Sequence, residues 1–168
     1  TVTAGLTAAK STGAIVSLIT RNIKILAVGT GARTIYRVGS TNNKLTIASG
    51  MWYGVNKVML ENCHYATISG GTFSGNSHGL YACTAATISG GTFIGNNFGL
   101  NACTAASISG GTFSGNNNGL YIFAAASISG GTFSGNNFGL SGCTFASISG
   151  GTFSGNTHGL YNCTAAVI

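Results

Sequence analysis

The sequence predicts an all-β protein: a right-handed parallel β-helix, or β-solenoid, of about eight coils with three short strands per coil. Three observations lead to this fold class. From Ala66 onward the chain of 168 residues repeats every 20 residues, and each repeat contains at least four glycine or asparagine residues. Short runs within each repeat alternate apolar and small polar residues, which is the period of a strand and not of a helix.

The repeats divide the chain into two parts. Five complete units follow one another from residue 66 to 165. Before them the period loosens, because Ile25, Ile47 and Ile68 are spaced 22 and 21 residues apart. We therefore expect an N-terminal cap with irregular first coils in residues 1–65 and regular coils in residues 66–168. Residues 6–10 are predicted to form one helical turn over the first coil.

Each regular unit is predicted to contain three strands, represented by residues 66–69, 72–74 and 80–82. Corners separate them, at Gly70-Gly71, at residues 75–79 and at residues 83–85. Glycine and asparagine fit the first two corners because they tolerate positive φ. Equivalent inward residues then form columns through the stack: Ile68, Ile88, Ile108, Ile128, Ile148; Phe73, Phe93, Phe113, Phe133, Phe153; and Leu80, Leu100, Leu120, Leu140, Leu160.

The composition argues against catalysis and against several classes of partner. Glu61 is the only acidic side chain, so the sequence cannot supply the two carboxyl groups that paired-carboxylate catalysis uses. We therefore expect neither an enzyme nor a bound cofactor or metal. The net charge of +6 comes from seven Lys/Arg residues scattered singly before residue 62, which is unlike a nucleic-acid-binding surface. The longest apolar stretch is interrupted by Arg21 and Lys24, so no membrane span is expected.

The five cysteines share one repeat position, and Phe123 occupies that position in the remaining coil. Because a hydrophobic ring replaces one of them, the column is interpreted as apolar filling made of reduced thiols. Bridges between adjacent coils, such as Cys63 to Cys83 or Cys143 to Cys163, are the alternative. The members are Cys63, Cys83, Cys103, Cys143 and Cys163.

Two outward surfaces are candidate binding sites. The first consists of two hydroxyl columns: Thr67, Thr87, Ser107, Ser127, Ser147 and Ser69, Ser89, Ser109, Ser129, Ser149. Such columns are similar to those of ice-binding solenoids, although three of the five pairs are Ser-x-Ser where those proteins usually carry Thr-x-Thr. Their alternative interpretation is an ordinary solvent-facing strand.

The second surface is an aromatic stripe made of Tyr81, Phe98, Tyr121, Phe138 and Tyr161. Each regular coil has one large ring at one of two positions, since tyrosine is absent wherever phenylalanine occupies the position three residues earlier. We predict either a shape-keeping role at a corner or a stacking surface for sugars.

The motifs resemble two families. The segment from Ala66 to Cys83 resembles the coils of pectate-lyase-like right-handed β-helices, and the opening residues 4–16 resemble their cap. The tetrads Phe73-Ser74-Gly75-Asn76 and its four equivalents are similar to the F-x-x-N repeats of polymorphic outer-membrane adhesins. The first resemblance would imply clustered Asp, Arg or Lys residues in an active site, and the repeats contain none.

These observations predict a non-catalytic structural or surface-exposed shaft, adhesive or filament-forming, located outside the cell or on a cell or virion surface. The alternatives are an ice-binding protein, a carbohydrate-binding β-helix and a degenerate lyase-like domain. Self-association is expected because residues 166–168 repeat the start of a strand. Glycans and ice are the other expected partners.

Overall fold

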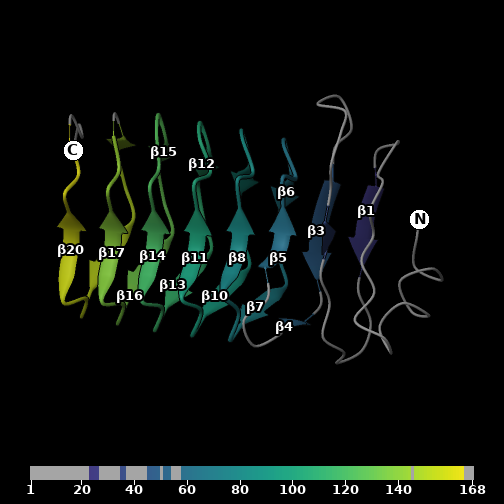
Figure 1. The fold of residues 1–168 in the computed structure, drawn as a ribbon, viewed down its shortest axis with the longest axis horizontal. Helices are drawn as coiled ribbons and strands as arrows, with labels where there is room; N and C mark the ends of the chain where they lie inside the picture. Colours follow the sequence, from purple (N-terminus) through teal and green to yellow (C-terminus); the bar gives the residue numbers. More distant parts are fainter. Residues whose placement is uncertain are drawn as a thin grey trace.

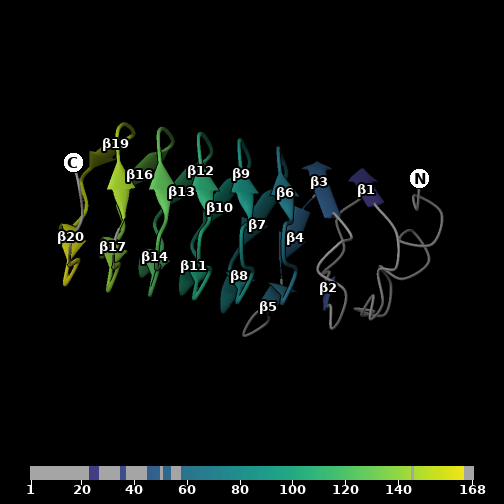
Figure 2. The same cartoon turned by 90° about the horizontal axis from the view of Figure 1, so that it is seen from above.

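A computed structural model describes residues 23–26, 35–36, 45–49, 51–53, 58–144 and 146–164, and these residues form a parallel β-solenoid. Figure 1 shows the coils stacked along the long axis, and Figure 2 shows the same stack after a quarter turn. Every strand pairs in parallel with its equivalents in the neighbouring coils, which gives three sheets along the molecule. The predicted fold class is confirmed.

The strands of the three sheets are as follows. Sheet I contains β1 (Ile23–Leu26), β3 (Leu45–Ser49), β6 (Thr67–Ile68), β9 (Thr87–Ile88), β12 (Ser107–Ile108), β15 (Ser127–Ile128) and β18 (Ser147–Ile148). Sheet II contains β4 (Met51–Tyr53), β7 (Thr72–Ser74), β10 (Thr92–Ile94), β13 (Thr112–Ser114), β16 (Thr132–Ser134) and β19 (Thr152–Ser154). Sheet III contains β2 (Ile35–Tyr36), β5 (Val58–Glu61), β8 (His78–Tyr81), β11 (Phe98–Asn101), β14 (Asn118–Tyr121), β17 (Phe138–Ser141) and β20 (His158–Tyr161).

The irregular first coils continue the same sheets. Ile25 pairs with Ile47, and Ile47 pairs with Ile68, as their spacing predicted. The larger sheets have seven strands among the described residues, which is one level fewer than the eight coils expected. The predicted helical turn at residues 6–10 lies outside the described residues.

The core consists of the predicted columns. The isoleucine, phenylalanine, leucine and inward alanine of each central coil are buried, and so is the cysteine or, in one coil, Phe123 at the cysteine position. Phe73, Phe93, Phe113, Phe133 and Phe153 stack with ring centroids 4.6–4.8 Å apart and planes within 6° of parallel. This separation equals the strand spacing of a sheet, about 4.8 Å, because each ring belongs to the next strand. Burial of each such ring contributes roughly 1.5–3 kcal/mol.

The corner between sheets I and II requires two glycines. Gly111 has a φ of +91°, where glycine alone is unstrained. A side chain at Gly110 would collide with the carbonyl oxygen of Ser89 in the preceding coil. The third corner also uses the left-handed region, at Ala82 and Ala85. The sequence did not predict that feature, because alanine is not a residue type typical of positive φ.

The strands of sheet III begin earlier than predicted, at His78 where the alternation indicated Leu80. Leu80 is fully buried, and a side chain at Gly79 would contact the ring of Phe93, so both positions face inward. His78 and Tyr81 consequently lie on the same outer face, with their rings 5.1 Å apart. Because of this corner at Gly79, a large ring at the position of His78 and one at the position of Tyr81 reach the same place on the outer face.

A column of buried asparagine amides stabilises the corner between sheets II and III. Asn116 Nδ2 donates to the Phe93 carbonyl at 2.9 Å and to Asn136 Oδ1 at 3.1 Å. Its Oδ1 accepts from the backbone N–H and the side chain of Asn96. The same pattern recurs from Asn76 to Asn156, and only Asn76 Oδ1, at the N-terminal end of the column, is buried without a partner among the described residues.

Candidate functional site

The predicted hydroxyl columns lie on the outer face of sheet I. Thr67, Thr87, Ser107, Ser127 and Ser147 pair residue for residue along the sheet. Thr67 is half-buried, and the other nine residues of the two columns are exposed. The strands here have only two residues, so the second column, from Ser69 to Ser149, lies just beyond the strand ends.

Part of the second column uses its hydroxyls within the protein. Ser69 Oγ donates to the Ile47 carbonyl at 3.4 Å, and Ser89 Oγ donates to the Ile68 carbonyl at 3.5 Å. A hydroxyl that donates to the backbone has less capacity to organise an external lattice of water or sugar. These contacts favour the interpretation of the second column as ordinary strand-end serines.

Sheet II carries a third hydroxyl surface that the sequence reasoning did not single out. Thr72, Thr92, Thr112, Thr132 and Thr152 occupy equivalent outward positions in every regular coil. A parallel row contains Ser74, Ser114, Ser134 and Ser154, and it is interrupted by Ile94, which is 44% exposed. The Thr-Phe-Ser alternation could have predicted this surface, because a buried phenylalanine in a strand places the residues on either side of it outward.

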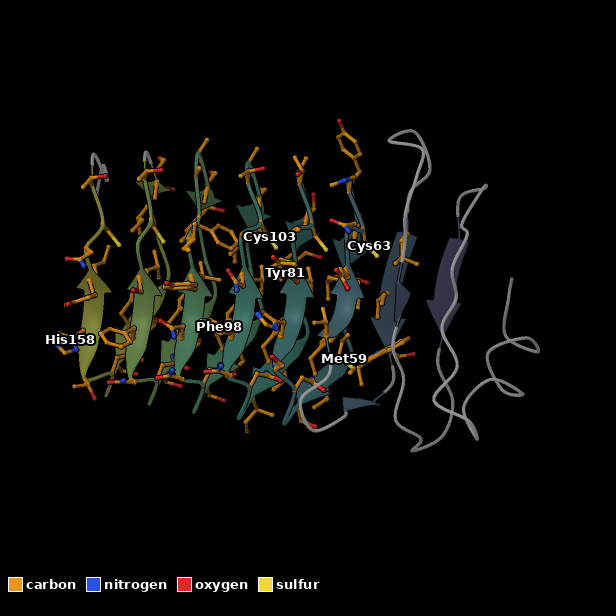
Figure 3. All side chains as sticks on the ribbon, in the orientation of Figure 1. Met59, Cys63, Tyr81, Phe98, Cys103 and His158 are labelled. Carbon is orange, nitrogen blue, oxygen red and sulfur yellow. The ribbon has the colours of Figure 1, made fainter. Side chains whose placement is uncertain are left out.

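The aromatic stripe lies on sheet III (Figure 3). Phe98 stacks on His78 with centroids 4.9 Å apart, and Tyr121 reaches back to Phe98 at 5.0 Å. Phe138, His158 and Tyr161 form a second group with centroids 4.9–5.3 Å apart. Burial in the stripe lowers the pKa of His78.

The phenylalanine rings of the stripe stack on histidine rings, whereas Tyr81 and Tyr161 are exposed. A sugar stacks on the face of an aromatic ring, and the face of Phe98 toward the preceding coil is covered by His78. Asn101 and Ser141, the small residues of the two coils that carry phenylalanine, are buried. This arrangement favours the shape-keeping role over a sugar platform.

The five cysteines lie along one inner edge as reduced thiols, and Cys63 and Cys103 are labelled in Figure 3. Cys63, Cys83, Cys103 and Cys143 are fully buried, whereas Cys163 is half-buried. Each sulfur lies within hydrogen-bond distance of the carbonyl two residues earlier, as with Cys83 and Tyr81 at 3.3 Å. Burial raises the pKa of the Cys83 thiol well above its ordinary value, so this thiol is protonated at neutral pH.

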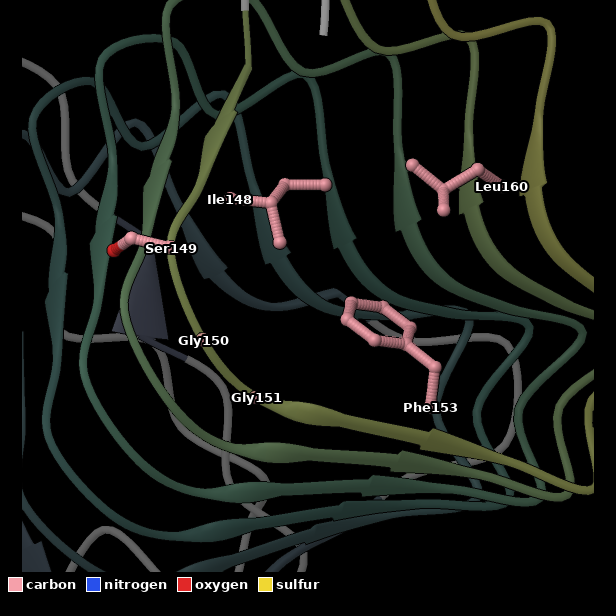
Figure 4. A pocket seen from close by; sticks show the side chains of 6 residues that line it. All are labelled: Ile148, Ser149, Gly150, Gly151, Phe153 and Leu160. Atoms are coloured by element: carbon pink, nitrogen blue, oxygen red, sulfur yellow. The ribbon is translucent and has the colours of Figure 1, made fainter. Parts of the chain in front are cut away.

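The C-terminal end of the described coils is a hollow (Figure 4). Ile148, Phe153 and Leu160 are the last members of the three core columns and line it together with residues 149–151. Its volume is about 340 Å³. Leu160 is 39% exposed, while its equivalents in the preceding four coils are fully buried.

Charged side chains contribute little to the described surface. Glu61 is half-buried at the end of β5, and of the seven Lys/Arg residues only Lys24, in β1, belongs to a described strand. No helix in the described part of the chain is long and apolar enough to cross a membrane.

The parallel sheets, repeating columns and absence of a grouped set of reactive side chains among the described residues define a β-solenoid repeat protein. The chain belongs to the NosD family, described as periplasmic copper-binding protein, which it matches over residues 2–165. No curated protein and no solved structure matches it. The resemblances to pectate-lyase-like proteins and to outer-membrane adhesins stay predictions.

The family description raises the question of which residues here suit copper. Within the described ranges, no three or more His, Cys, Asp or Glu side chains group together as a metal site would require. His64 Nδ1 accepts a hydrogen bond from the Thr84 backbone N–H at 3.1 Å, and His78 and His158 belong to the aromatic stripe. Thiols are the donor class that selects Cu(I), so the cysteine column is the part of the structure that fits the metal chemically.

Proposed function

We propose that this chain is a non-catalytic structural shaft of the cell envelope or the extracellular space. The observation that supports this proposal is the strand register: through the regular coils each strand pairs with its equivalent in the next coil without a shift. A stack in which each coil packs on the next is rigid along its axis, so it can hold the outer faces of its coils at fixed distances from one another. The periplasmic description of the family supports an envelope location.

The absence of enzymatic activity is part of this proposal. Glycoside hydrolysis typically uses two carboxyl groups, and the sequence has one acidic side chain. The histidines lie in separate coils or in stacked rings, and the four fully buried thiols lie inside the core. The residues present therefore support a scaffold better than a reaction.

We further propose that the shaft associates end to end with a second copy. The three terminal strands β18, β19 and β20 leave one side of each sheet unpaired among the described residues, next to the apolar hollow. Unpaired strand edges template pairing with another chain, and charged side chains are the usual defence against it. From residue 62 to 168 the sequence contains no charged side chain.

Sedimentation velocity over a wide concentration range, with negative-stain electron microscopy, tests this association. We expect oligomers or filaments with strands perpendicular to the long axis, and we expect Leu160→Lys to dissolve them. Ile94→Lys is the matched control, because Ile94 is similarly exposed but lies on the side of the shaft. A monomer at every concentration would refute end-to-end association, and equal effects of both substitutions would indicate lateral contacts instead.

Two alternative functions have less support and have direct assays. Ice binding would appear as thermal hysteresis abolished by a bulky residue at Ser109 in sheet I, and the internal hydrogen bonds of Ser69 and Ser89 argue against it. Carbohydrate binding would appear on a glycan array, and the mutual stacking of the aromatic rings argues against it.

A further inference from the structure

A serine and a histidine form a close pair at the corner between sheets II and III. Ser77 Oγ lies 2.8 Å from His78 Nδ1, and both residues are half-buried, so the pair can be reached from solvent. In the tautomer with its proton on Nε2, the imidazole accepts the hydrogen bond of the serine hydroxyl at Nδ1. A hydroxyl within hydrogen-bond reach of a neutral imidazole is the arrangement that activates a serine as a nucleophile.

The surrounding rings hold the His78 imidazole in place. It stacks on Phe98 of the next coil with centroids 4.9 Å apart and planes at 18°, and Tyr81 lies against it at 5.1 Å. A base whose ring is fixed in this way stays oriented toward the hydroxyl. Burial lowers the pKa of His78, so its ring is neutral at neutral pH and can accept a proton.

The pair occurs in one coil only among the described residues. Ser77 is the one member of its row whose side chain hydrogen-bonds to the residue after it. A histidine follows only one other member, Thr157, and that coil lacks the contact. The row consists of Ser77, Asn97, Asn117, Asn137 and Thr157.

An exposed amide of the next coil lies beside the pair. The Phe98 N–H donates to the Ser77 carbonyl at 3.0 Å, which places Asn97 next to Ser77 in the stack. Asn97 Oδ1 accepts from Asn117 Nδ2 at 3.1 Å, whereas Asn97 Nδ2 donates to no described residue. The N–H groups of Asn97 are therefore available to the oxygen of a reacting carbonyl group.

We infer that Ser77 is an acyl-acceptor site, with His78 as its base and an activated acyl ester, such as a thioester, as the acyl donor. The Ser77 oxygen attacks the carbonyl carbon of the donor, and His78 Nδ1 takes the hydroxyl proton. The bond from that carbon to the sulfur or oxygen of the leaving group breaks, and the leaving group takes the proton from His78. The product is an ester on Ser77, formed without an oxidant or a reductant. This inference adds a modification to the shaft and does not depend on its end-to-end association.

Reaction of the full chain with p-nitrophenyl acetate near neutral pH tests the site. We expect stable acetylation of Ser77, mapped by mass spectrometry of chymotryptic peptides, together with release of p-nitrophenolate. His78→Phe should slow the acetylation of Ser77 by about 100-fold or more, because a positioned general base contributes at least that factor. Phenylalanine occupies the equivalent position at Phe98 and Phe138, so this substitution keeps the stacked rings. Circular dichroism melting checks that the variant is folded.

Two comparisons separate activation of the hydroxyl from simple exposure. Ser74 is a half-buried serine of the same coil without an imidazole partner, and it should react far more slowly than Ser77. His158→Phe removes the equivalent histidine and should leave the rate at Ser77 unchanged. Absence of an acetyl group on Ser77 would overturn the inference. So would equal rates at Ser77 and Ser74, or a rate at Ser77 that His78→Phe does not change.

Discussion

Ile122 combines two features that a surface residue rarely combines. Its backbone φ is 49°, in the left-handed region, and its side chain is 51% exposed. A β-branched residue is strained at such a φ because its side chain crowds the backbone. Three equivalent positions hold Asn62, Gly142 and Asn162, which are residue types that tolerate this conformation, and the other two hold Ala82 and Ala102, which are not β-branched. Ile122 is therefore a point of stored strain in the corner next to Phe123.

Replacing Ile122 by asparagine should stabilise the protein. We expect Ile122→Asn to raise the free energy of unfolding by about 1 kcal/mol, because the left-handed conformation costs an ordinary residue roughly 1–2 kcal/mol. Urea denaturation measures the change. Ile94→Ser is the control, since Ile94 is similarly exposed but lies in a strand. A gain of equal size in both variants would mean that loss of exposed apolar surface, and not relief of strain, is responsible.

The asparagine column links successive coils as the hydrophobic columns do, but through hydrogen bonds. Its amides connect coils to one another at a corner where the backbone alone leaves donors and acceptors unpaired. Buried polar groups of this kind cost little when all are satisfied and much when one partner is removed. The column should therefore be more sensitive to substitution than its polar composition indicates.

Asn116→Ala tests this sensitivity. The change would leave the buried Asn96 N–H and the Phe93 carbonyl without these partners, so we expect a loss of at least about 2 kcal/mol in the free energy of unfolding. Asn117→Ala removes the neighbouring amide, which is exposed and hydrogen-bonded only to other exposed amides, and should cost less than about 0.5 kcal/mol. Similar losses in the two variants would contradict the assignment of the inner amides as structural links.

The sequence predicted these columns because a 20-residue period places like residues above like residues. Ile25, Ile47 and Ile68 were matched correctly even where the period drifts, since a column needs only an apolar residue at each level. The start of β8 at His78 was not predictable from alternation, because Gly79 and Leu80 both face inward at a corner. The candidate sites were predicted as rows of residues, whereas ring stacking and thiol access depend on three-dimensional packing.

At the scale of the whole molecule, the buried thiols couple stability to alkaline pH. Burial, followed by the neighbouring Cys163, raises the pKa of Cys143 to about 12 from its ordinary value of 9.0. Between these values the unfolded chain loses the proton and the folded chain keeps it. The contribution of this thiol to stability is thus fully present below pH 9.0 and is lost as the pH rises toward about 12.

The melting temperature should therefore fall between pH 9.0 and about 12, and less steeply in Cys143→Ala than in the natural sequence. The thiol contributes a loss of roughly 1.4 kcal/mol per pH unit over this range. Calorimetry at a series of pH values measures both slopes, and Ser149→Ala serves as the control because it removes an exposed hydroxyl from an adjacent strand end. Identical slopes for Cys143→Ala and the natural sequence would show that this thiol does not couple folding to pH.

The register of the stack has a consequence for how such a gene can change. Asn96, Asn116 and Asn136 make the same contacts with the coils on either side, and the phenylalanine rings repeat the same separation. An in-frame duplication of 60 nucleotides between two of these coils would supply every new residue with partners already in place. Loss of a single codon would instead turn the inward residues of the following strand outward. Recombination between the DNA segments that encode these repeats would therefore lengthen or shorten the shaft by whole coils while each face keeps its chemistry.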